Sequence, residues 1–375
     1  MRRPNNSGSI SWDKTNSKWR AWIKDDEGKR IIKRFAERSD AENWLAEMRV
    51  KLNKGLYIPS NSKTFGEFSV EYLDTFCTEL RPKTQADYLY TLGLLKPLYS
   101  IPLQKLNALQ VQRTLNKLTC AVATKKKVYG LLKRIIKKAR QLKYIEQDFT
   151  DALTSPSGQQ SFKVKVFTED EIKKILNYAK SSLTYRRYYP IIYTAVLTGM
   201  RLGEILGLRY VDVTPTSITV SQTVVEVLGR TIISKPKTIA GQRVIAIPEE
   251  LGRMLLNYNN KNAMPTDLVF RSHNNTPIAQ NNFGKHFRDI QKAAGVERKN
   301  FHCLRHSHAS VLLQQNYDLA SLSMRLGHQN ISTTLKFYGH YLPGKEEKVI
   351  EKLKAFTKKG PERDQLPTDF LAKAK

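Results

Sequence analysis

Four short segments in the C-terminal half of the sequence combine arginine, lysine, histidine and tyrosine, which are residue types able to act together on a phosphodiester. The segments are residues 198–208, 237–248, 302–309 and 326–340. Guanidinium groups can hold the non-bridging phosphate oxygens, and a tyrosine hydroxyl can attack phosphorus and keep the energy of the broken bond in a covalent link. Lysine and histidine can exchange the protons that this transfer requires. The sequence lacks the glycine-rich nucleotide loops, the nucleophile elbow and the zincin motif that would indicate other chemistries.

In this order, the four segments resemble the catalytic boxes of the tyrosine recombinases, the family of phage and conjugative-element integrases. Each box alone is a weak signal, because a single arginine, histidine or tyrosine is most often an ordinary surface or core residue. Four boxes in the family's order are a specific signal. The resemblance covers residues 163–375 and implies an active site formed by Arg201, Lys237, His302, Arg305, His328 and Tyr338.

The same resemblance implies what the cationic residues do. Arg201 and Arg305 would clamp the phosphate while negative charge develops in the transition state. Lys237, expected at the tip of a hairpin, would protonate the departing 5′ oxygen, and Lys235 is the alternative proton donor. Glu204 is interpreted as a partner that orients Arg201, although the pair could also be an ordinary ion pair.

The histidines and the tyrosine complete the implied site. His302 would exchange a proton with the nucleophile, and His328 would donate a hydrogen bond to the phosphate. Tyr338 is preferred to Tyr341 as the nucleophile because its distance from the Gly-His pair matches the family pattern. Three further histidines are interpreted as neighbours without a direct catalytic role: His306, His308 and His340.

Neither a metal ion nor a cofactor is expected, because cations of the protein take the place of a metal in this chemistry. His302, His306 and His308 lie beside Cys303, but no second pair of ligands follows at a spacing typical of zinc sites. The sequence holds three cysteines, which cannot form a disulfide framework or a four-thiolate zinc site.

The composition points to a polyanionic partner. The 375 residues include 63 Lys and Arg against 34 Asp and Glu, a formal charge of +29, and nucleic acid is the commonest partner of such a chain. The apolar runs are too short for a membrane span, and the N-terminus lacks the apolar stretch of a signal peptide. We therefore expect a soluble protein of the bacterial cytoplasm, associated with the nucleoid.

The expected fold is a multidomain α+β chain of three domains. The resemblance implies an arm-type DNA-binding domain over residues 1–58, with a small three-stranded β-sheet and a helix. A helical core-binding (SAM-like) domain follows over residues 63–155, and a mainly helical catalytic domain with a small antiparallel sheet and a C-terminal tail occupies residues 163–375. Polar linkers rich in Pro, Gly and Ser lie between them.

In the first domain, residues alternate along the expected strands so that one face of the sheet is basic. Residues 18–24 and 29–35 read as two paired strands, and residues 39–42 read as a capping box that opens a helix. We expect the tryptophans to form its core and the opposite face to enter a DNA groove; a merely solvated basic face is the alternative. The candidate DNA-binding residues of this face are Arg20, Trp22, Lys24, Arg30 and Arg34.

The second domain is expected to be helical from 64 to 153, with new helices opening at Thr84 and Asn107. Residues 117–143 hold ten basic residues and no acidic one, on a helix whose other face is apolar. So one-sided a run favours contact with a phosphate backbone over a simply solvated surface. Its candidate DNA-binding residues are Lys125, Lys126, Lys127, Lys133, Arg134, Lys137 and Lys138.

The resemblance implies a site-specific recombinase that cleaves and rejoins double-stranded DNA at core and arm attachment sites through a 3′-phosphotyrosyl intermediate. It also implies a homotetramer on DNA, an excisionase partner and a host DNA-bending protein. Two rivals remain. A type IB topoisomerase shares the nucleophile chemistry but needs no arm-binding domain, and an architectural DNA-binding protein would not need the complete set of catalytic residues.

Overall fold

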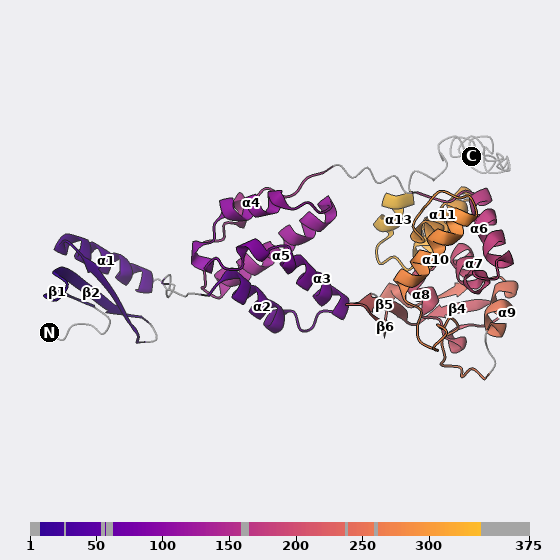
Figure 1. Cartoon of the computed structure of the whole chain (residues 1–375), viewed down its shortest axis with the longest axis horizontal. Coiled ribbons are helices and arrows are strands. Elements are labelled where there is room, and N and C mark those ends of the chain that lie inside the picture. Colours follow the sequence, from indigo (N-terminus) through magenta and orange to yellow (C-terminus); the bar gives the residue numbers. More distant parts are fainter. Residues whose placement is uncertain are drawn as a thin grey trace, which may run out of the picture. The chain divides into compact units, whose positions relative to one another are not determined.

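The computed structural model describes residues 8–25, 28–53, 57, 63–158, 165–236, 239–258 and 262–338 (Figure 1). The chain divides into two compact units, residues 1–160 and 161–375. Within the described residues, every helix is too short or too polar to cross a lipid bilayer. The first unit contains a β-sheet with one helix and, further along the chain, a bundle of helices; the second unit is mainly helical.

A three-stranded antiparallel sheet opens the first unit, in the order β1-β2-β3, and one helix, α1, packs on it. The alternation of buried and exposed side chains predicted for β2 is confirmed, because Ala21 and Ile23 are buried and Lys24 is exposed. Aliphatic residues of the helix, Leu45 and Met48, form the core with them. The expected tryptophan core is wrong. The elements are β1 (Ser9–Asp13), β2 (Lys18–Lys24), β3 (Arg30–Phe35) and α1 (Arg38–Asn53).

The helical part of the first unit is built around the amphipathic helix α5, whose apolar face supplies much of a buried cluster of leucine, isoleucine and phenylalanine side chains. Asn107 and Gln110 form the expected capping box at the start of α4. The expected helix start at Thr84 is wrong, because Pro82 occupies the first turn of α3, where a missing N–H costs nothing. The elements are α2 (Phe65–Phe76), α3 (Pro82–Gly93), α4 (Ala108–Lys117), α5 (Val122–Gln141) and the short 3-10 turns Lys96–Leu98, Leu103–Lys105 and Thr150–Ala152.

The second unit begins with α6, where Thr168 and Glu171 form a capping box. It then runs into α7, which packs against α6, α8 and α11, so that α7 lies inside the helical core. The single small sheet expected here is two separate two-stranded antiparallel sheets, β4-β7 and β5-β6. Helices α11, α12 and α13 follow one another and contact each other.

The bounds in the second unit are α6 (Glu169–Ser181), α7 (Tyr189–Thr198), α8 (Leu202–Leu206), β4 (Ser217–Val220), β5 (Thr223–Val227), β6 (Arg230–Ser234), β7 (Arg243–Ala246), α9 (Glu249–Asn257), α10 (Gln280–Ala293), α11 (His302–Gln314), α12 (Leu319–Leu326) and α13 (Ile331–Tyr338). Short 3-10 turns at Arg186–Tyr188, Tyr210–Asp212 and Ile239–Gly241 connect them. In Figure 1, α8 and α13 lie toward one side of this unit and α9 toward the other.

Candidate active site

Arg305 is the buried centre of the site. It lies in the first turn of α11, and only 1% of its surface is exposed. Its guanidinium donates to the carbonyl oxygen of Gly199 over 2.9 Å and to that of Leu326 over 2.6 Å. Burial, with the positive charge of Arg201 beside it, lowers the pKa of the Arg305 guanidinium to about 9, which leaves the group protonated at neutral pH.

Two glycines shape the backbone that receives these hydrogen bonds. Gly199 ends α7 with a φ of 65°, and Gly327 ends α12 with a φ of 68°. A Cβ on Gly199 would lie 2.6 Å from the ring of His308, and one on Gly327 would lie 2.8 Å from the guanidinium of Arg243. Both positions therefore require glycine for the left-handed turn and for the close packing around it.

Arg201 is held by a carboxylate that also holds a second arginine. Its guanidinium donates to Glu204 over 2.7 Å and to the carbonyl oxygen of Gly327 over 3.4 Å. On the other side of Glu204, Arg243 donates over 2.9 Å. Burial alone would raise the pKa of Glu204, but Arg243 and Arg201 outweigh it and lower the pKa to about 2. Glu204 thus stays ionised and orients Arg201, whose side chain keeps 40% of its surface exposed.

Arg243 was missed by the sequence interpretation, although it lies within one of the four boxes. Only 7% of its side chain is exposed, and its Nε donates to the carbonyl oxygen of Arg325 over 2.6 Å. It therefore ties β7 to the end of α12 as well as to Glu204. Arg243 lies six residues after the start of its box and has no signal of its own in the sequence, because its partners are distant in the chain.

His328 accepts a hydrogen bond in this arrangement. Arg305 Nη2 lies 2.9 Å from His328 Nε2, and because a guanidinium only donates, Nε2 must accept. The ring proton is then on Nδ1, which lies 2.7 Å from the hydroxyl of Thr334. Burial and the charges of Arg305 and Arg201 lower the pKa of His328 to about 3. Donation from His328 to a phosphate therefore requires Nε2 to gain a proton when the phosphate arrives.

Tyr338 ends α13 and is almost completely buried, with 1% of its surface exposed. Its hydroxyl lies 2.6 Å from Nδ1 of His306, the residue that follows Arg305 on α11. Phe337 also contacts the ring of His306. The interpretation of His306 as a mere neighbour missed this contact, which joins two boxes more than thirty residues apart in the chain.

His302 lies one helical turn before His306, and the two rings meet edge to face with their centroids 4.9 Å apart. Burial and the positive charges of Arg305 and Arg201 lower the pKa of His302 to about 4, although the residue keeps an exposed edge. A hollow of about 290 Å³ lies beside it, lined among others by Arg201, Gly203 and Gln280. The described residues thus bring together Arg201, His302, Arg305, His328 and Tyr338.

Comparisons with known proteins show which family the chain is similar to. Residues 165–344 match the phage integrase family. A tyrosine recombinase XerC-like protein of Caldanaerobacter subterraneus is 26% identical over 368 residues, which cover 88% of this chain and 93% of that protein. The ICEBs1 integrase of Bacillus subtilis is 28% identical over 203 residues, which cover 51% of this chain and 54% of the integrase. Residues 165–344, which contain all four boxes, therefore belong to the family of phage integrases and tyrosine recombinases.

Solved structures share the fold of the recombinase. The Tn1549 transposon integrase in complex with a circular intermediate DNA superimposes with a TM-score of 0.68 at 20% identity, covering 78% of this chain and all of that one. A lambda integrase tetramer bound to a Holliday junction gives a TM-score of 0.59 at 18% identity, covering 90% of this chain and 96% of that one.

Part of the expected site lies outside the described residues of the recombinase. Lys237, the expected proton donor, is one such residue, and so are His340 and Tyr341. Lys235, the alternative donor, is described and exposed directly after β6. Within the described ranges, no three His, Cys, Asp or Glu side chains are grouped as a metal site requires.

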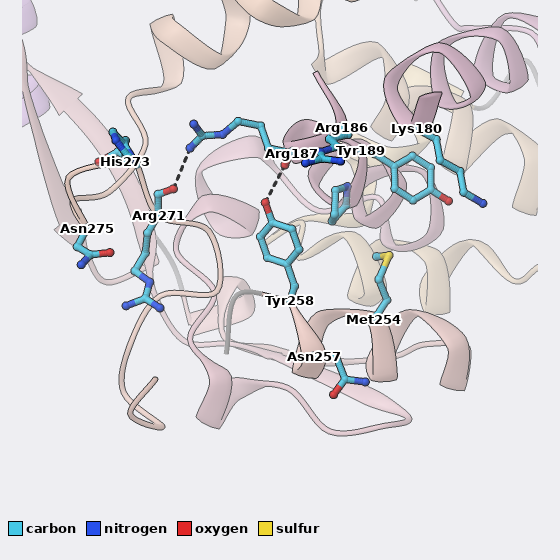
Figure 2. Close-up of a pocket in the computed structure, with 12 residues that line it drawn as sticks. Lys180, Arg186, Arg187, Tyr189, Met254, Asn257, Tyr258, Arg271, His273 and Asn275 are labelled. Atoms are coloured by element: carbon cyan, nitrogen blue, oxygen red, sulfur yellow. Dashed lines mark hydrogen bonds between the residues drawn. The ribbon is translucent and has the colours of Figure 1, made fainter. Parts of the chain in front are cut away.

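A larger hollow of about 990 Å³ lies away from the catalytic cluster (Figure 2). Tyr189 borders it at the start of α7, whereas Arg201 follows the other end of that ten-residue helix, about 15 Å further along its axis. Arg187 crosses the hollow, donating to the carbonyl oxygen of Arg271 over 3.2 Å, and the hydroxyl of Tyr258 donates to the carbonyl oxygen of Arg187 over 3.0 Å. This hollow therefore belongs to the opposite end of α7 from the catalytic residues.

The candidate DNA-binding residues of the recombinase occupy two surfaces. In the N-terminal sheet, Arg20 pairs with Arg34 and Lys24 with Arg30, so these four side chains share one face. Trp22 shares this face, and the Arg30 guanidinium lies 4.6 Å from the centre of its ring. We name this set the β-face. Two of its guanidinium groups are constrained: Arg34 pairs with Asp13 at 2.8 Å, and Arg20 Nε is buried without a hydrogen-bond partner.

The second surface is the basic side of α5. Lys126, Lys127, Arg134 and Lys137 are exposed, whereas Lys125, Lys133 and Lys138 are half-buried. Lys127 lies 3.6 Å from Asp87, and Lys138 lies over the ring of Phe76 at 4.2 Å. We name this set the α5 surface.

Proposed function

We propose that this tyrosine recombinase is a site-specific integrase that cleaves and rejoins DNA through a covalent 3′-phosphotyrosyl link at Tyr338. The observation that supports this most is the convergence, on the ends of α7, α11, α12 and α13, of two arginines, a neutral histidine and a buried tyrosine. Such a set supplies the cations that hold a phosphate, and it also supplies the nucleophile, without a metal ion.

The arginines would exchange partners when DNA binds. In the unliganded protein their guanidinium groups donate to the carbonyl oxygens of Gly199, Leu326 and Gly327. A phosphodiester accepts stronger, charge-assisted hydrogen bonds than a carbonyl, so its non-bridging oxygens would replace these contacts. Glu204 stays bound to Arg201 and keeps it aimed at the phosphate.

Cleavage then follows as a balanced transfer. The oxygen of Tyr338 bonds to phosphorus as its proton passes to a histidine of the site, while the bond from phosphorus to the 5′ oxygen breaks. Lys237, or Lys235 in its place, gives its proton to that oxygen as it leaves as a hydroxyl. Rejoining reverses both steps with a 5′ hydroxyl from the partner strand, and the strand break is closed without ATP.

Tyr338→Phe tests this proposal. We expect the variant to lose cleavage and strand exchange completely, since no nucleophile remains, while DNA affinity stays nearly unchanged because phosphate contacts dominate it. The assay is covalent capture on a core site carrying a nick near the cleavage point, in excess EDTA and without ATP. Adduct formation by the phenylalanine variant would place the nucleophile elsewhere, with Tyr341 first in line, and strict dependence on magnesium would overturn the mechanism.

The same substrate separates the two rival functions. Covalent capture by the wild-type protein excludes a purely architectural DNA-binding protein. Exchange of strands between two sites excludes a topoisomerase, which reseals the strand it cut. We propose that recombination takes place in a homotetramer assembled on double-stranded DNA in the bacterial nucleoid, with an excisionase and a host DNA-bending protein setting its direction.

The β-face and the α5 surface support a division of DNA binding between domains. We propose that residues 1–58 bind arm sites through the β-face, and that residues 63–155 and residues 163–375 both bind the core site. The β-face offers four cationic side chains on a three-stranded sheet, and strands of β-sheets can read a DNA groove. The α5 surface offers a row of cations along a helix, suited to a phosphate backbone.

Footprinting of two fragments on the element's attachment DNA tests this division. Residues 63–375 should still bind and cleave the core site, more weakly, but should fail to integrate efficiently. Residues 1–58 should protect different sites flanking the core, with an affinity that falls steeply as salt rises. Coinciding footprints, or no binding by the N-terminal fragment, would refute the arm-binding role.

A further inference from the structure

The contact between His306 and Tyr338 carries an inference about how the nucleophile is activated. Tyr338 is 1% exposed, and its hydroxyl lies 2.6 Å from His306 Nδ1. The two ring centroids are 5.6 Å apart. His306 follows Arg305 directly on α11, so the same helical turn holds the phosphate clamp and the group that contacts the nucleophile.

The direction of this hydrogen bond follows from the protonation of the ring. Burial and the positive charge of Arg305 lower the pKa of His306 to about 4, so the imidazole is neutral at physiological pH. A phenol, with a reference pKa near 10, is a far stronger acid than the N–H of a neutral imidazole. The Tyr338 hydroxyl is therefore the donor and Nδ1 of His306 the acceptor, which leaves the other ring proton on Nε2.

We propose that His306 orients the hydroxyl of Tyr338 and accepts its proton as the phenol oxygen attacks phosphorus. The inference rests on the proposed function and adds a residue to its mechanism. The bond from oxygen to phosphorus forms as the O–H proton passes to Nδ1, and the bond to the 5′ oxygen breaks with a proton from the lysine. In the rejoining step the 5′ hydroxyl attacks phosphorus and returns its proton to the lysine, the bond to the tyrosine oxygen breaks, and the imidazolium returns its proton to that oxygen.

The bound substrate makes His306 a better base than it is in the unliganded protein. Arg305 contributes to the low pKa of the ring, and a phosphodiester on Arg305 offsets that positive charge. His302 packs on His306 one turn earlier on α11 and fixes the plane of its ring. On this reading His306 takes the proton from the tyrosine directly. His302, which was expected to exchange a proton with the tyrosine, can do so only through His306.

The first test compares substitutions of His306 in single-turnover cleavage of the nicked core site at saturating DNA. His306→Ala removes both orientation and the base, and should lower the rate of adduct formation about a hundredfold. His306→Asn keeps a hydrogen-bond acceptor close to the position of Nδ1 but cannot take a proton, and should remain at least tenfold slow by the same reasoning. The matched control is His273→Asn, an exposed histidine in the loop after Arg271, which should cleave at the wild-type rate.

DNA affinity, measured in parallel, verifies that each variant is folded. If His306→Ala unfolds the protein, the cleavage rate of His306→Asn decides the test. Cleavage by both His306 variants within about twofold of wild type would overturn the inference, and so would faster cleavage, which would mean that His306 holds the nucleophile out of reach. A wild-type protein that forms no adduct would instead contradict the proposed function itself.

A second test asks whether the defect lies in proton transfer. A ring-fluorinated tyrosine at position 338 has a more acidic phenol and needs less help from a base. Its introduction should leave the wild-type rate little changed but should recover most of the rate lost in His306→Asn. A defect caused only by altered packing would not depend on the acidity of the phenol. An equally low cleavage rate of His306→Asn with tyrosine and with fluorotyrosine at position 338 would therefore exclude His306 as the base.

Discussion

The α5 surface and the catalytic cluster are both strongly cationic, but they hold their charge in opposite ways. On the α5 surface, Lys126, Lys127 and Lys137 are exposed, and the Lys127 ammonium lies 3.6 Å from a half-exposed Asp87. In the catalytic cluster, Arg305 is 1% exposed and donates two hydrogen bonds of 2.9 Å or less to backbone carbonyls. The exposed lysines of the α5 surface are solvated, whereas the guanidinium group of Arg305 is held in place by backbone carbonyls.

This difference assigns the two surfaces to different steps of the reaction. Exposed ammonium groups contribute to affinity through release of counterions, which is sensitive to salt and insensitive to small displacements. Buried guanidinium groups with fixed directions can favour the transition state over the bound substrate, because they need no reorganisation when charge develops. Mutations in the two surfaces should therefore affect different measurements.

The largest effect is expected for Arg305. Arg305→Ala and Arg305→Lys should each lower the rate of adduct formation at saturating DNA about a hundredfold or more, because a lysine cannot hold two divergent carbonyls or two phosphate oxygens at once. The single-turnover rate on the nicked core site measures this. Arg253→Ala, which removes an exposed arginine from α9, is the control and should cleave normally. A lysine variant that cleaves at the wild-type rate would show that charge alone matters here.

A smaller effect, on stability, is expected for Glu204. Its pKa lies at about 2 in the folded protein instead of 4.5, so its ion pairs stabilise the fold above pH 4.5 and lose this contribution as the pH falls toward 2. Glu204→Gln should lower the free energy of unfolding at pH 7 by about 3 kcal/mol, since Arg201 and the buried Arg243 lose their anion. The difference from wild type should shrink below pH 4.5.

Thermal melting of both proteins across that pH range provides the measurement. Glu249→Gln is the matched control, because Glu249 forms an exposed ion pair with Arg253 and its loss should change stability by less than about 1 kcal/mol. A Glu204 variant that melts with wild type at every pH would show that the two arginines do not depend on this carboxylate.

The smallest effect per residue is expected on the α5 surface. Lys126→Ala and Lys137→Ala should each weaken core-site binding severalfold and reduce the salt dependence of log affinity by about one unit, the change for one lost phosphate contact. The cleavage rate at saturating DNA should not change. Lys180→Ala removes the same charge near the opposite end of α7 from Arg201 and is the control. Equal losses in all three variants would point to net charge instead of a defined contact.

Local sequence patterns predicted the elements of the fold well. The capping residue Asn107 is at the expected helix start, and the amphipathic helix predicted within residues 117–143 is α5. These features depend on residues three or four apart, which the sequence shows directly. The start of α3 was misplaced because the polar pattern at Thr84 indicated a helix start there. The helix begins two residues earlier, at Pro82, whose rigid ring favours the first turn of a helix.

Contacts between distant segments could not be predicted in the same way. The boxes indicated which segments converge, but not that Tyr338 contacts His306, nor that Arg243 shares Glu204 with Arg201. Each of these contacts depends on how α11, α13 and β7 are packed, which no local spacing encodes. The tryptophans were misjudged for a related reason: Trp12 is 47% exposed because aliphatic side chains of α1 fill the core beneath the sheet.

The left-handed glycines at the ends of α7 and α12 have a consequence for how quickly the enzyme can exchange its ligand. Their turns present carbonyl dipoles to Arg305 and Arg201, at the negative ends of two helices. A carboxylate in these places would compete with every incoming phosphate, whereas a partial charge holds the guanidinium groups in position and yields to a full one. The contacts that hold the two guanidinium groups are therefore weak enough for a phosphodiester to displace them, and they can form again when the phosphodiester leaves after rejoining.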